Sequence, residues 1–220
     1  MDKPRFLQRL RSGAALLGVQ VSSDAGEGLF WLSSELLRWN AKVNLTAILD
    51  PNEVADKHIL DSLAPLLLLD PEARSLLDAG TGPGFPGLPM ALARPELEVW
   101  LAEAVAKKVG FLKHAIAGLG LGGRVHAVQV RLRGEPEREG IPPVDAAISR
   151  AFRDVAGWAA LGAAYLRQGG QLLAMTGGGA EAPPLPGWKD PQVHRFQLPS
   201  GDGRTLLAYR RLPEVSASRR

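Results

Sequence analysis

The sequence predicts an α/β protein with a mostly parallel sheet of seven strands, helices on both faces of the sheet, and a helical extension at the N-terminus. Two observations lead to this prediction. After residue 70, short apolar segments alternate with helical segments, and the first apolar segment runs into a turn with glycines at alternate positions. Before residue 70, apolar residues recur at helical spacing. We therefore expect residues 1–70 to form the N-terminal helical extension and residues 71–220 the sheet domain, packed together as one unit.

The N-terminal extension contains recognisable helix starts. A first helix is expected over residues 4–17 and a second from Asp24, whose carboxylate can cap the helix. A third start is at Asp50, which is followed by a first-turn proline and by Glu53 as a reciprocal acid. These signals indicate an all-helical segment ahead of the first strand.

Seven apolar segments have the length and composition of strands. They cover residues 76–78, 98–102, 125–130, 144–148, 171–175, 193–198 and 205–211. The last two flank a turn rich in glycine and aspartate, so we expect an antiparallel hairpin that closes one edge of the sheet. In such folds ligands bind at the carboxyl ends of the first strands.

The turn after the first expected strand has the order D-x-G-x-G-x-G, from Asp78 through Gly80, Gly82 and Gly84. Glycines let the backbone approach a ligand and adopt dihedrals that other residues avoid. A dinucleotide fingerprint would need its third glycine at position 85, where the chain has Phe85. The turn instead resembles motif I of Rossmann-like, class I methyltransferases that use S-adenosyl-L-methionine. A tight strand-to-helix turn without a ligand is the alternative.

An acidic residue, Glu103, ends the second expected strand about twenty residues beyond the glycines, where a carboxylate can bind both ribose hydroxyls of a nucleoside cofactor. Glu103 could instead cap the next helix. The two roles are compatible.

Composition fits one globular enzyme-sized unit of 220 residues, 45% hydrophobic and 22% charged. The net charge of +3 permits a polyanionic partner without requiring one. The absence of cysteine excludes disulfides, thiolate catalysis and thiolate zinc sites. No apolar stretch is long enough for a membrane span or a signal peptide, so we expect a cytoplasmic protein with no membrane partner. The sequence does not fix an oligomeric state; a monomer is the default expectation.

Motifs outside the glycine turn make the resemblance specific. They are Arg38-Trp39-Asn40, Asn44-Leu45-Thr46, His58-Ile59-Leu60-Asp61-Ser62, the glycine turn through Pro86-Gly87, Lys107-Lys108 with Phe111-Leu112, and Ile148-Ser149-Arg150-Ala151-Phe152. With these motifs the chain resembles, over most of its length, the RsmG (GidB) family of bacterial ribosomal RNA small-subunit methyltransferase G. The resemblance implies transfer of a methyl group from S-adenosyl-L-methionine to nitrogen 7 of a guanine in 16S rRNA, either as RNA or in a partly assembled small subunit.

The resemblance also implies cofactor contacts at Gly80, Phe85, Gly134, Glu135 and Arg150. Gly134 and Glu135 follow the third expected strand, where an adenine edge would lie. Arg150 follows the fourth, and its guanidinium could hold the cofactor carboxylate or an RNA phosphate. A surface ion pair is the alternative for Arg150.

The chemistry implied by the resemblance needs no general base. Nitrogen 7 of guanine carries a lone pair and no proton, so we expect no catalytic acid or base and no metal, only alignment. Polar residues near the expected strand ends and in the helical extension are candidates for RNA contacts: Asn44, His58, Arg131, Arg133, Arg153 and Arg204. His58 could instead form a structural pair with Asp61, and Asn44 could cap a turn. A metal at His58 and Asp61 would lack partner ligands.

One departure from the family pattern lies after the fifth expected strand, where relatives commonly carry a lysine before a glycine and this chain has Met175-Thr176-Gly177. Two other functions remain open at this stage. The chain could be a noncatalytic RNA-binding or ribosome-assembly factor that keeps a relic cofactor fold, or a nicotinamide-dependent oxidoreductase.

Overall fold

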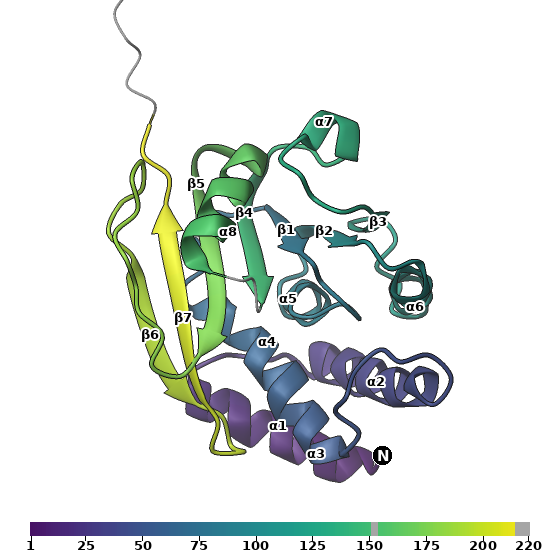
Figure 1. The fold of residues 1–220 in the computed structure, drawn as a ribbon. Helices are drawn as coiled ribbons and strands as arrows, with labels where there is room; N and C mark the ends of the chain where they lie inside the picture. Colours follow the sequence, from purple (N-terminus) through teal and green to yellow (C-terminus); the bar gives the residue numbers. More distant parts are fainter. Residues whose placement is uncertain (151–153, 214–220) are drawn as a thin grey trace, which may run out of the picture.

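The computed structural model describes residues 1–150 and 154–213 (Figure 1). Its centre is a seven-stranded sheet in the order β3-β2-β1-β4-β5-β7-β6. The strands are β1 Ser75–Ala79, β2 Glu98–Glu103, β3 Val125–Gln129, β4 Val144–Arg150, β5 Leu166–Gly177, β6 Gln192–Gln197 and β7 Gly203–Arg210. The first five run parallel, whereas β7 is antiparallel to both β5 and β6. The predicted strands and the edge hairpin are therefore confirmed.

The helices fall into an N-terminal group and a group that alternates with the strands. The N-terminal group comprises α1 Lys3–Leu17, α2 Ser23–Asn40, α3 Pro51–Glu53, the π-helix η1 Val54–Leu60, α4 Asp61–Leu63 and the 3-10 helix η2 Ala64–Leu67. The second group comprises α5 Gly87–Ala93, α6 Ala106–Gly118, α7 Pro136–Glu139, α8 Val155–Gly162 and the 3-10 helix η3 Ala163–Tyr165. Segments α3 to η2 are continuous and carry His58 and Asp61 at their middle.

The start of α2 differs from the prediction. Ser22, not Asp24, is the capping residue, and its hydroxyl accepts a hydrogen bond from the Ala25 N–H at 3.1 Å. Asp24 then lies in the first turn, where its charge favours the helix dipole. The start at Asp50 is confirmed, because its carboxylate accepts from the N–H groups of Asn52 and Glu53. The Glu53 carboxylate accepts a hydrogen bond from Lys57 at 2.8 Å, one turn along the helix.

Apolar side chains form a cluster on each face of the sheet. One cluster joins the N-terminal helices, α5 and α6 to strand residues such as Leu76 and Ile148. The other packs α8 and η3, with Trp158 and Tyr165, against residues such as Leu77 and Leu172. The side chains of consecutive strand residues therefore pack on opposite faces of the sheet, as the two-residue period of a strand requires. The first cluster runs without interruption across residue 70, so the helical extension shares its core with the sheet.

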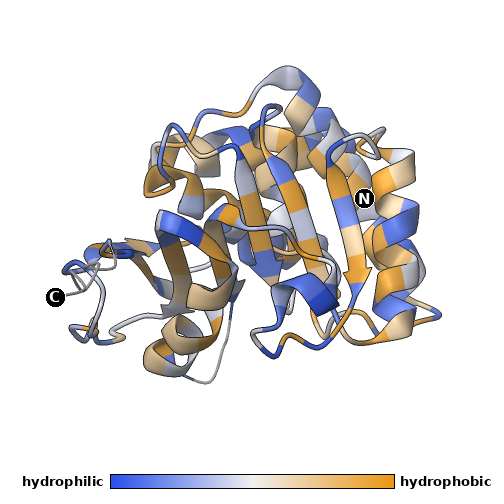
Figure 2. Cartoon of the chain, turned by 90° about the horizontal axis from the view of Figure 1, so that it is seen from above, coloured by the Kyte–Doolittle hydropathy of each residue, from blue (hydrophilic) through white to orange (hydrophobic). Residues whose placement is uncertain are grey.

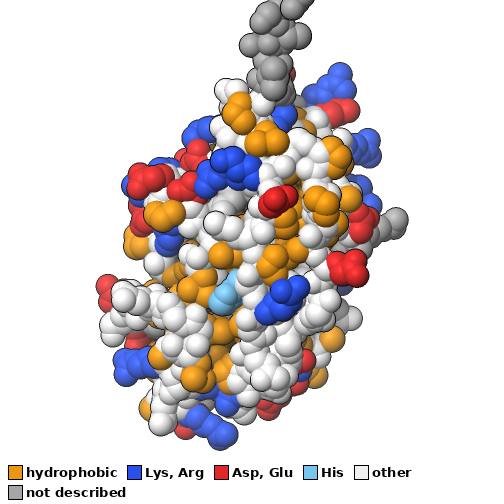
Figure 3. All heavy atoms as spheres, turned by 90° about the vertical axis from the view of Figure 1, so that its left-hand side faces the viewer, with side chains coloured by type: hydrophobic (Ala, Val, Ile, Leu, Met, Phe, Trp, Pro, Cys, Tyr) orange, Lys and Arg blue, Asp and Glu red, His pale blue; other side chains and the backbone are white. Residues whose placement is uncertain are grey.

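Colouring by hydropathy shows apolar bands across the central strands, which lie between the helices (Figure 2). On the face beside β6, side chains of Lys and Arg are interspersed with those of Asp and Glu around apolar ones (Figure 3). This face carries no single-sign patch, so it does not by itself mark a nucleic-acid surface.

Candidate functional site

The ends of several strands meet at one edge of the sheet. Ala79 at the end of β1 is in register with Ala102 of β2 and Ser149 of β4. Arg150 pairs with Met175, and because β7 runs antiparallel, its Arg204 lies opposite Gly177 at the end of β5. Sheet pairing thus gathers the glycine turn, Arg150 and Arg204 at one edge, although they are far apart in the sequence.

Gly80 and Gly82 leave an opening at this edge. Both have a left-handed backbone, with φ of 69° and 60°. Among the described residues, no heavy atom outside the adjoining chain lies within 4 Å of where a Cβ on either glycine would sit. The turn therefore offers backbone with free space beside it, as a close-fitting ligand requires.

Gly84 and Phe85 do not share this opening. A Cβ on Gly84 would lie 2.3 Å from Cδ1 of Leu88, so the missing side chain at that position allows the following helix to pack. The Phe85 side chain is 1% exposed and stacks on the His58 ring at 4.7 Å between centroids. At these two positions only backbone atoms could face a ligand in the opening.

Asp78 holds the glycine turn in place through hydrogen bonds. Its Oδ2 accepts hydrogen bonds from the Thr81 hydroxyl at 2.6 Å and the Gly87 N–H at 2.7 Å. The side chain is fully buried, and burial raises the pKa of Asp78 to about 6 against these two hydrogen bonds. Asp78 connects the strand, the turn and the start of α5, which fixes the shape of the opening.

The ribose-binding candidate Glu103 ends β2 at the same edge and is 7% exposed. Its Oε1 accepts a hydrogen bond from the Val105 N–H at 2.8 Å, and its Oε2 lies 3.9 Å from the Lys108 ammonium. The carboxylate therefore stabilises the N-terminus of α6, which is the helix-capping role given above as the alternative. Its oxygens can still accept hydrogen bonds from a ligand.

The loop after β3 is fixed by a tyrosine. The N–H of Gly134 donates to the Tyr165 hydroxyl at 2.8 Å, and that hydroxyl donates to Glu139. The pKa of Tyr165 is raised to about 12, first by burial and then by the Glu139 carboxylate. Glu135 is exposed, and its carboxylate lies 3.0 Å from the Arg138 guanidinium, at the surface of the loop.

Arg150 and His58 form the centre of the site. The Arg150 guanidinium lies 5.7 Å from the Phe85 ring and donates to the Lys57 carbonyl at 3.3 Å and to Nδ1 of His58 at 3.4 Å. Because Nδ1 accepts, the network assigns the ring proton to Nε2, which lies 2.8 Å from the Thr46 hydroxyl. Burial, and then the charge of Arg150, lowers the pKa of His58 to about 3. His58 is therefore neutral near pH 7 and holds Arg150 in place.

The surface-ion-pair alternative for Arg150 is thus wrong, since its guanidinium is enclosed by Phe85, His58 and the backbone of Lys57. Burial lowers the pKa of Arg150, while the nearby carboxylates of Asp61 and Asp78 raise it. Because Arg150 lines the cleft, its guanidinium can donate hydrogen bonds to a polar group of a ligand.

Two clefts open at the ends of β4 and β5 and share Met175, Thr176 and Gly177. The Arg150 cleft, of about 320 Å³, is lined by Ile48, Lys57, His58, Asp61, Arg150, Met175, Thr176, Gly177 and Arg204. The Trp158 cleft, of about 490 Å³, is lined by Ser149, Asp154, Val155, Ala156, Trp158, Ala174, Met175, Thr176, Gly177, Ala180, Glu181 and Pro183. Thr176, where the resemblance led us to expect a lysine, donates to the Thr205 carbonyl at 2.8 Å.

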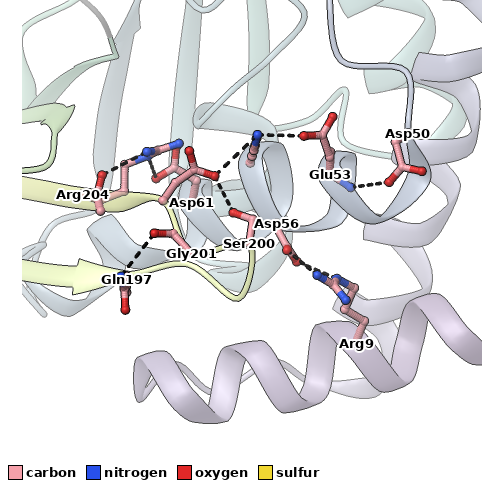
Figure 4. Close-up of polar contacts among 12 residues, drawn as sticks. Arg9, Asp50, Glu53, Asp56, Asp61, Gln197, Ser200, Gly201 and Arg204 are labelled. Carbon is pink, nitrogen blue, oxygen red and sulfur yellow. Dashed lines mark hydrogen bonds and ion pairs between the residues drawn. The ribbon is translucent and has the colours of Figure 1, made fainter.

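Charged residues connect the β6–β7 turn to the continuous helix (Figure 4). Nε of Arg204 lies 3.3 Å from Oδ1 of Asp61, and the Lys57 ammonium lies 3.5 Å from Asp202. Burial raises the pKa of Asp61, and the charges of Arg204 and Arg150 oppose this shift. The structural pair expected between His58 and Asp61 is wrong, because His58 bonds to Thr46 and Arg150 whereas Asp61 faces Arg204.

The remaining RNA-contact candidates are dispersed. Asn44, Arg131 and Arg133 are exposed, and none of them lines either cleft. Asn40, not Asn44, fixes the turn after α2, because its side chain bonds the backbone of Leu45 and Thr46. Arg153 lies outside the described residues.

Comparison with known proteins shows the family to which this chain belongs. The family model described as "rRNA small subunit methyltransferase G" (GidB) matches residues 28–197, which include the glycine turn, His58 and Arg150. The chain belongs to this family. One relative, "Ribosomal RNA small subunit methyltransferase G" of Myxococcus xanthus, is 53% identical over 180 residues, covering 80% of this chain and 81% of the relative. The protein of the same name from an Anaeromyxobacter species is 46% identical and covers 94% and 99%.

Solved structures share the fold of the family. An O-methyltransferase from Bacillus cereus in complex with SAH matches with a TM-score of 0.56 at 16% identity, over 82% of this chain and 91% of that one. TrmN from Thermus thermophilus matches with a TM-score of 0.54 at 22% identity, over 70% and 48%. The chain therefore has the Rossmann-like fold of class I methyltransferases, as predicted. In the part of the chain that the structure describes, no helix combines the length and apolarity needed to cross a bilayer.

Sequence reasoning did not select Lys57 and Asp61 as site residues, although both line the Arg150 cleft beside His58. A signal for Asp61 was present. It follows His58 by three residues, so both project from one face of a helix. The face itself could be recognised as part of a site only after Arg150 and Arg204 were placed opposite it.

Proposed function

We propose that this protein transfers the methyl group of S-adenosyl-L-methionine to nitrogen 7 of a guanine in 16S rRNA, in the cytoplasm. Membership of the rRNA small subunit methyltransferase G family supports the reaction class and the RNA. The observation that carries the proposal is the opening over Gly80 and Gly82, since free space that suits a cofactor adjoins the Arg150 cleft of about 320 Å³.

The residues at the opening fit the cofactor. Space beside Gly80 and Gly82 suits a chain that lies against backbone, and the buried Glu103 carboxylate suits a ribose diol. Backbone at Gly134 and Glu135 could contact the adenine, and Arg150 the cofactor carboxylate. When bound, the cofactor supplies a methyl group made electrophilic by its sulfonium.

The titratable groups at the site suit a reaction without a general base. His58 is neutral, and its Nδ1 accepts a hydrogen bond from Arg150. Asp78 lies at the base of the glycine turn, where its Oδ2 accepts two hydrogen bonds. His58 is therefore not free to take a proton from a substrate near pH 7, and Asp78 is fully buried and does not line the Arg150 cleft. Nitrogen 7 of guanine attacks through its lone pair, so the residues need only hold the base in line, and alignment can supply about 7 to 11 kcal/mol.

The RNA must present an unstacked guanine to the Arg150 cleft. Lys57, Arg150 and Arg204 line that cleft and could contact the base or its phosphates. The exposed Asn44, Arg131 and Arg133 could contact RNA outside it.

The decisive experiment maps 7-methylguanosine chemically in small-subunit rRNA from cells with and without this protein. One guanine should lose its methyl group in the deletion strain and regain it when purified protein, labelled cofactor and small subunits are mixed. Parallel reactions with naked rRNA identify the substrate. Tight RNA binding without label transfer would indicate the assembly-factor alternative, and affinity for nicotinamide dinucleotides instead of S-adenosyl-L-methionine the oxidoreductase alternative.

A further inference from the structure

Asp61 carries a buried carboxylate at the Arg150 cleft, where its partner within the described residues is the ion pair with Arg204. Its side chain is 6% exposed and lines the Arg150 cleft. Oδ1 is buried and forms no hydrogen bond with any part of the chain in residues 1–150 or 154–213. Arg204 lies 3.3 Å from Oδ1 as an ion-pair partner, and its charge opposes the rise in the pKa of Asp61 that burial causes. Burying an acceptor without a donor is costly, so an unfilled one that lines a cleft indicates a ligand that donates.

The position of Asp61 suits one particular edge of a base. Arg150 lies 5.7 Å from the ring of Phe85 in the glycine turn and lines the same cleft as Asp61. A guanine whose nitrogen 7 faces the cofactor opening turns the opposite side of its ring, with N1–H and the exocyclic amine, away from that opening. In the Arg150 cleft, Asp61 is the carboxylate among the lining residues.

We propose that Asp61 accepts hydrogen bonds from N1–H and the 2-amino group of the target guanine and thereby selects guanine over the other bases. Two adjacent donors occur on this edge of guanine alone, whereas adenine and cytosine present a ring acceptor and uracil a single donor between two acceptors. This inference rests on the proposed function, because it assumes that the base enters the Arg150 cleft with nitrogen 7 toward the methyl donor.

The test removes each partner of the contact in turn. Small-subunit RNA is assembled with inosine, which lacks the 2-amino group but keeps nitrogen 7 and N1–H, at the nucleotide mapped above. In the natural protein, kcat/KM for inosine should fall about tenfold or more relative to guanine, as expected for a lost hydrogen bond to a charged group. Asp61→Asn should lower kcat/KM for guanine at least as much and should then treat inosine and guanine alike.

Asp202→Asn is the matched control, since it makes the same change in a partly exposed carboxylate that pairs with Lys57 but does not itself line the cleft. It should retain the full guanine-to-inosine difference. Affinity for S-adenosyl-L-methionine and the thermal midpoint report whether Asp61→Asn keeps its fold and cofactor opening; both should match the natural protein.

Two outcomes would overturn the inference: an inosine penalty that persists unchanged in Asp61→Asn, or natural protein that methylates inosine as fast as guanine. The second comparison needs no variant, so it decides even if Asp61→Asn does not fold. If the natural protein fails to methylate guanine at all, the proposed function itself is wrong, which is a separate result.

Discussion

Gly82 and Gly120 have the same left-handed backbone in different surroundings, with φ of 60° and 67°. Gly82 borders the opening at the glycine turn, whereas Gly120 follows α6 at the end of that helix away from Glu103. Valine at either position costs about 1–2 kcal/mol of backbone strain. Gly82→Val should also fill the opening and weaken binding of S-adenosyl-L-methionine at least tenfold by calorimetry. Gly120→Val should bind it normally, and equal losses in the two variants would argue against the opening as the cofactor site.

His58 should make stability depend on pH. Its pKa is lowered from 6.5 to about 3 in the folded protein, so the folded state binds fewer protons than the unfolded state between these values. The His58 contribution is therefore complete above pH 6.5 and is lost as pH falls toward 3. Between pH 7 and 5 the loss should be about 2 kcal/mol relative to His58→Asn, measured by denaturant unfolding.

Asp78 has the opposite effect on the pH dependence of stability. Its pKa is raised from 3.8 to about 6, so its protonation favours the folded state as pH falls through this range. Asp78 is present in both the natural protein and His58→Asn, so the difference in their free energies of unfolding reports the contribution of His58 alone. If that difference is the same at pH 7 and pH 5, His58 titrates normally and is not the neutral support of Arg150.

The roles of side chains at the site were predictable from the sequence where the local sequence pattern determines them. The glycine turn and Glu103 follow from a strand that ends in a known kind of loop. The partners of His58 were not predictable, because Thr46 and Arg150 reach it through a folded turn and a neighbouring strand. The same holds for Gly84, where contact with Leu88, not the turn itself, sets the role of the glycine.

At the scale of elements, α1 is joined to the π-helix η1 by a buried ion pair. Arg9 donates from Nε and Nη2 to the two oxygens of Asp56, at 2.7 and 2.5 Å, and the Asp56 side chain is 1% exposed. Arg9→Ala would leave that carboxylate buried without its cation. We expect a loss of about 3 kcal/mol, at the low end for buried pairs since Arg9 is one-third exposed.

Arg38→Ala is the control for Arg9→Ala, because Arg38 is exposed and its partner Glu35 keeps its contact with His114 when the arginine is removed. Urea unfolding of both variants should show a much smaller change for Arg38→Ala. Equal effects would mean that the Arg9 pair does not hold α1 in place.

Element boundaries show where local signals suffice. Asp50 starts its helix as predicted, because a capping side chain and a first-turn proline act within four residues. Strand β5 begins at Leu166, five residues before the expected start, although Arg167 to Gly170 have poor strand propensity. Pairing of Leu166 with Val144 of β4 extends the strand, so tertiary contact overrides the local preference.

For the whole molecule, the shared core predicts that the helical extension and the sheet unfold together. Phe6, Leu10 and Leu29 belong to the same apolar cluster as Leu76 and Ile148. Calorimetry should show one transition with equal calorimetric and van't Hoff enthalpies. Residues 71–220 produced alone should bind a hydrophobic dye and lack a cooperative transition, because one face of their sheet would be exposed. Two separate transitions in the full chain would show independent domains.

The placement of β7 between β5 and β6 has a consequence for biosynthesis. β6 emerges from the translating ribosome before β7, yet within the sheet it is hydrogen-bonded only to β7. A growing polypeptide that stops short of residue 203 thus lacks both the edge of the sheet and Arg204. A stop codon or frameshift ahead of residue 203 should therefore abolish the enzyme as completely as an early one.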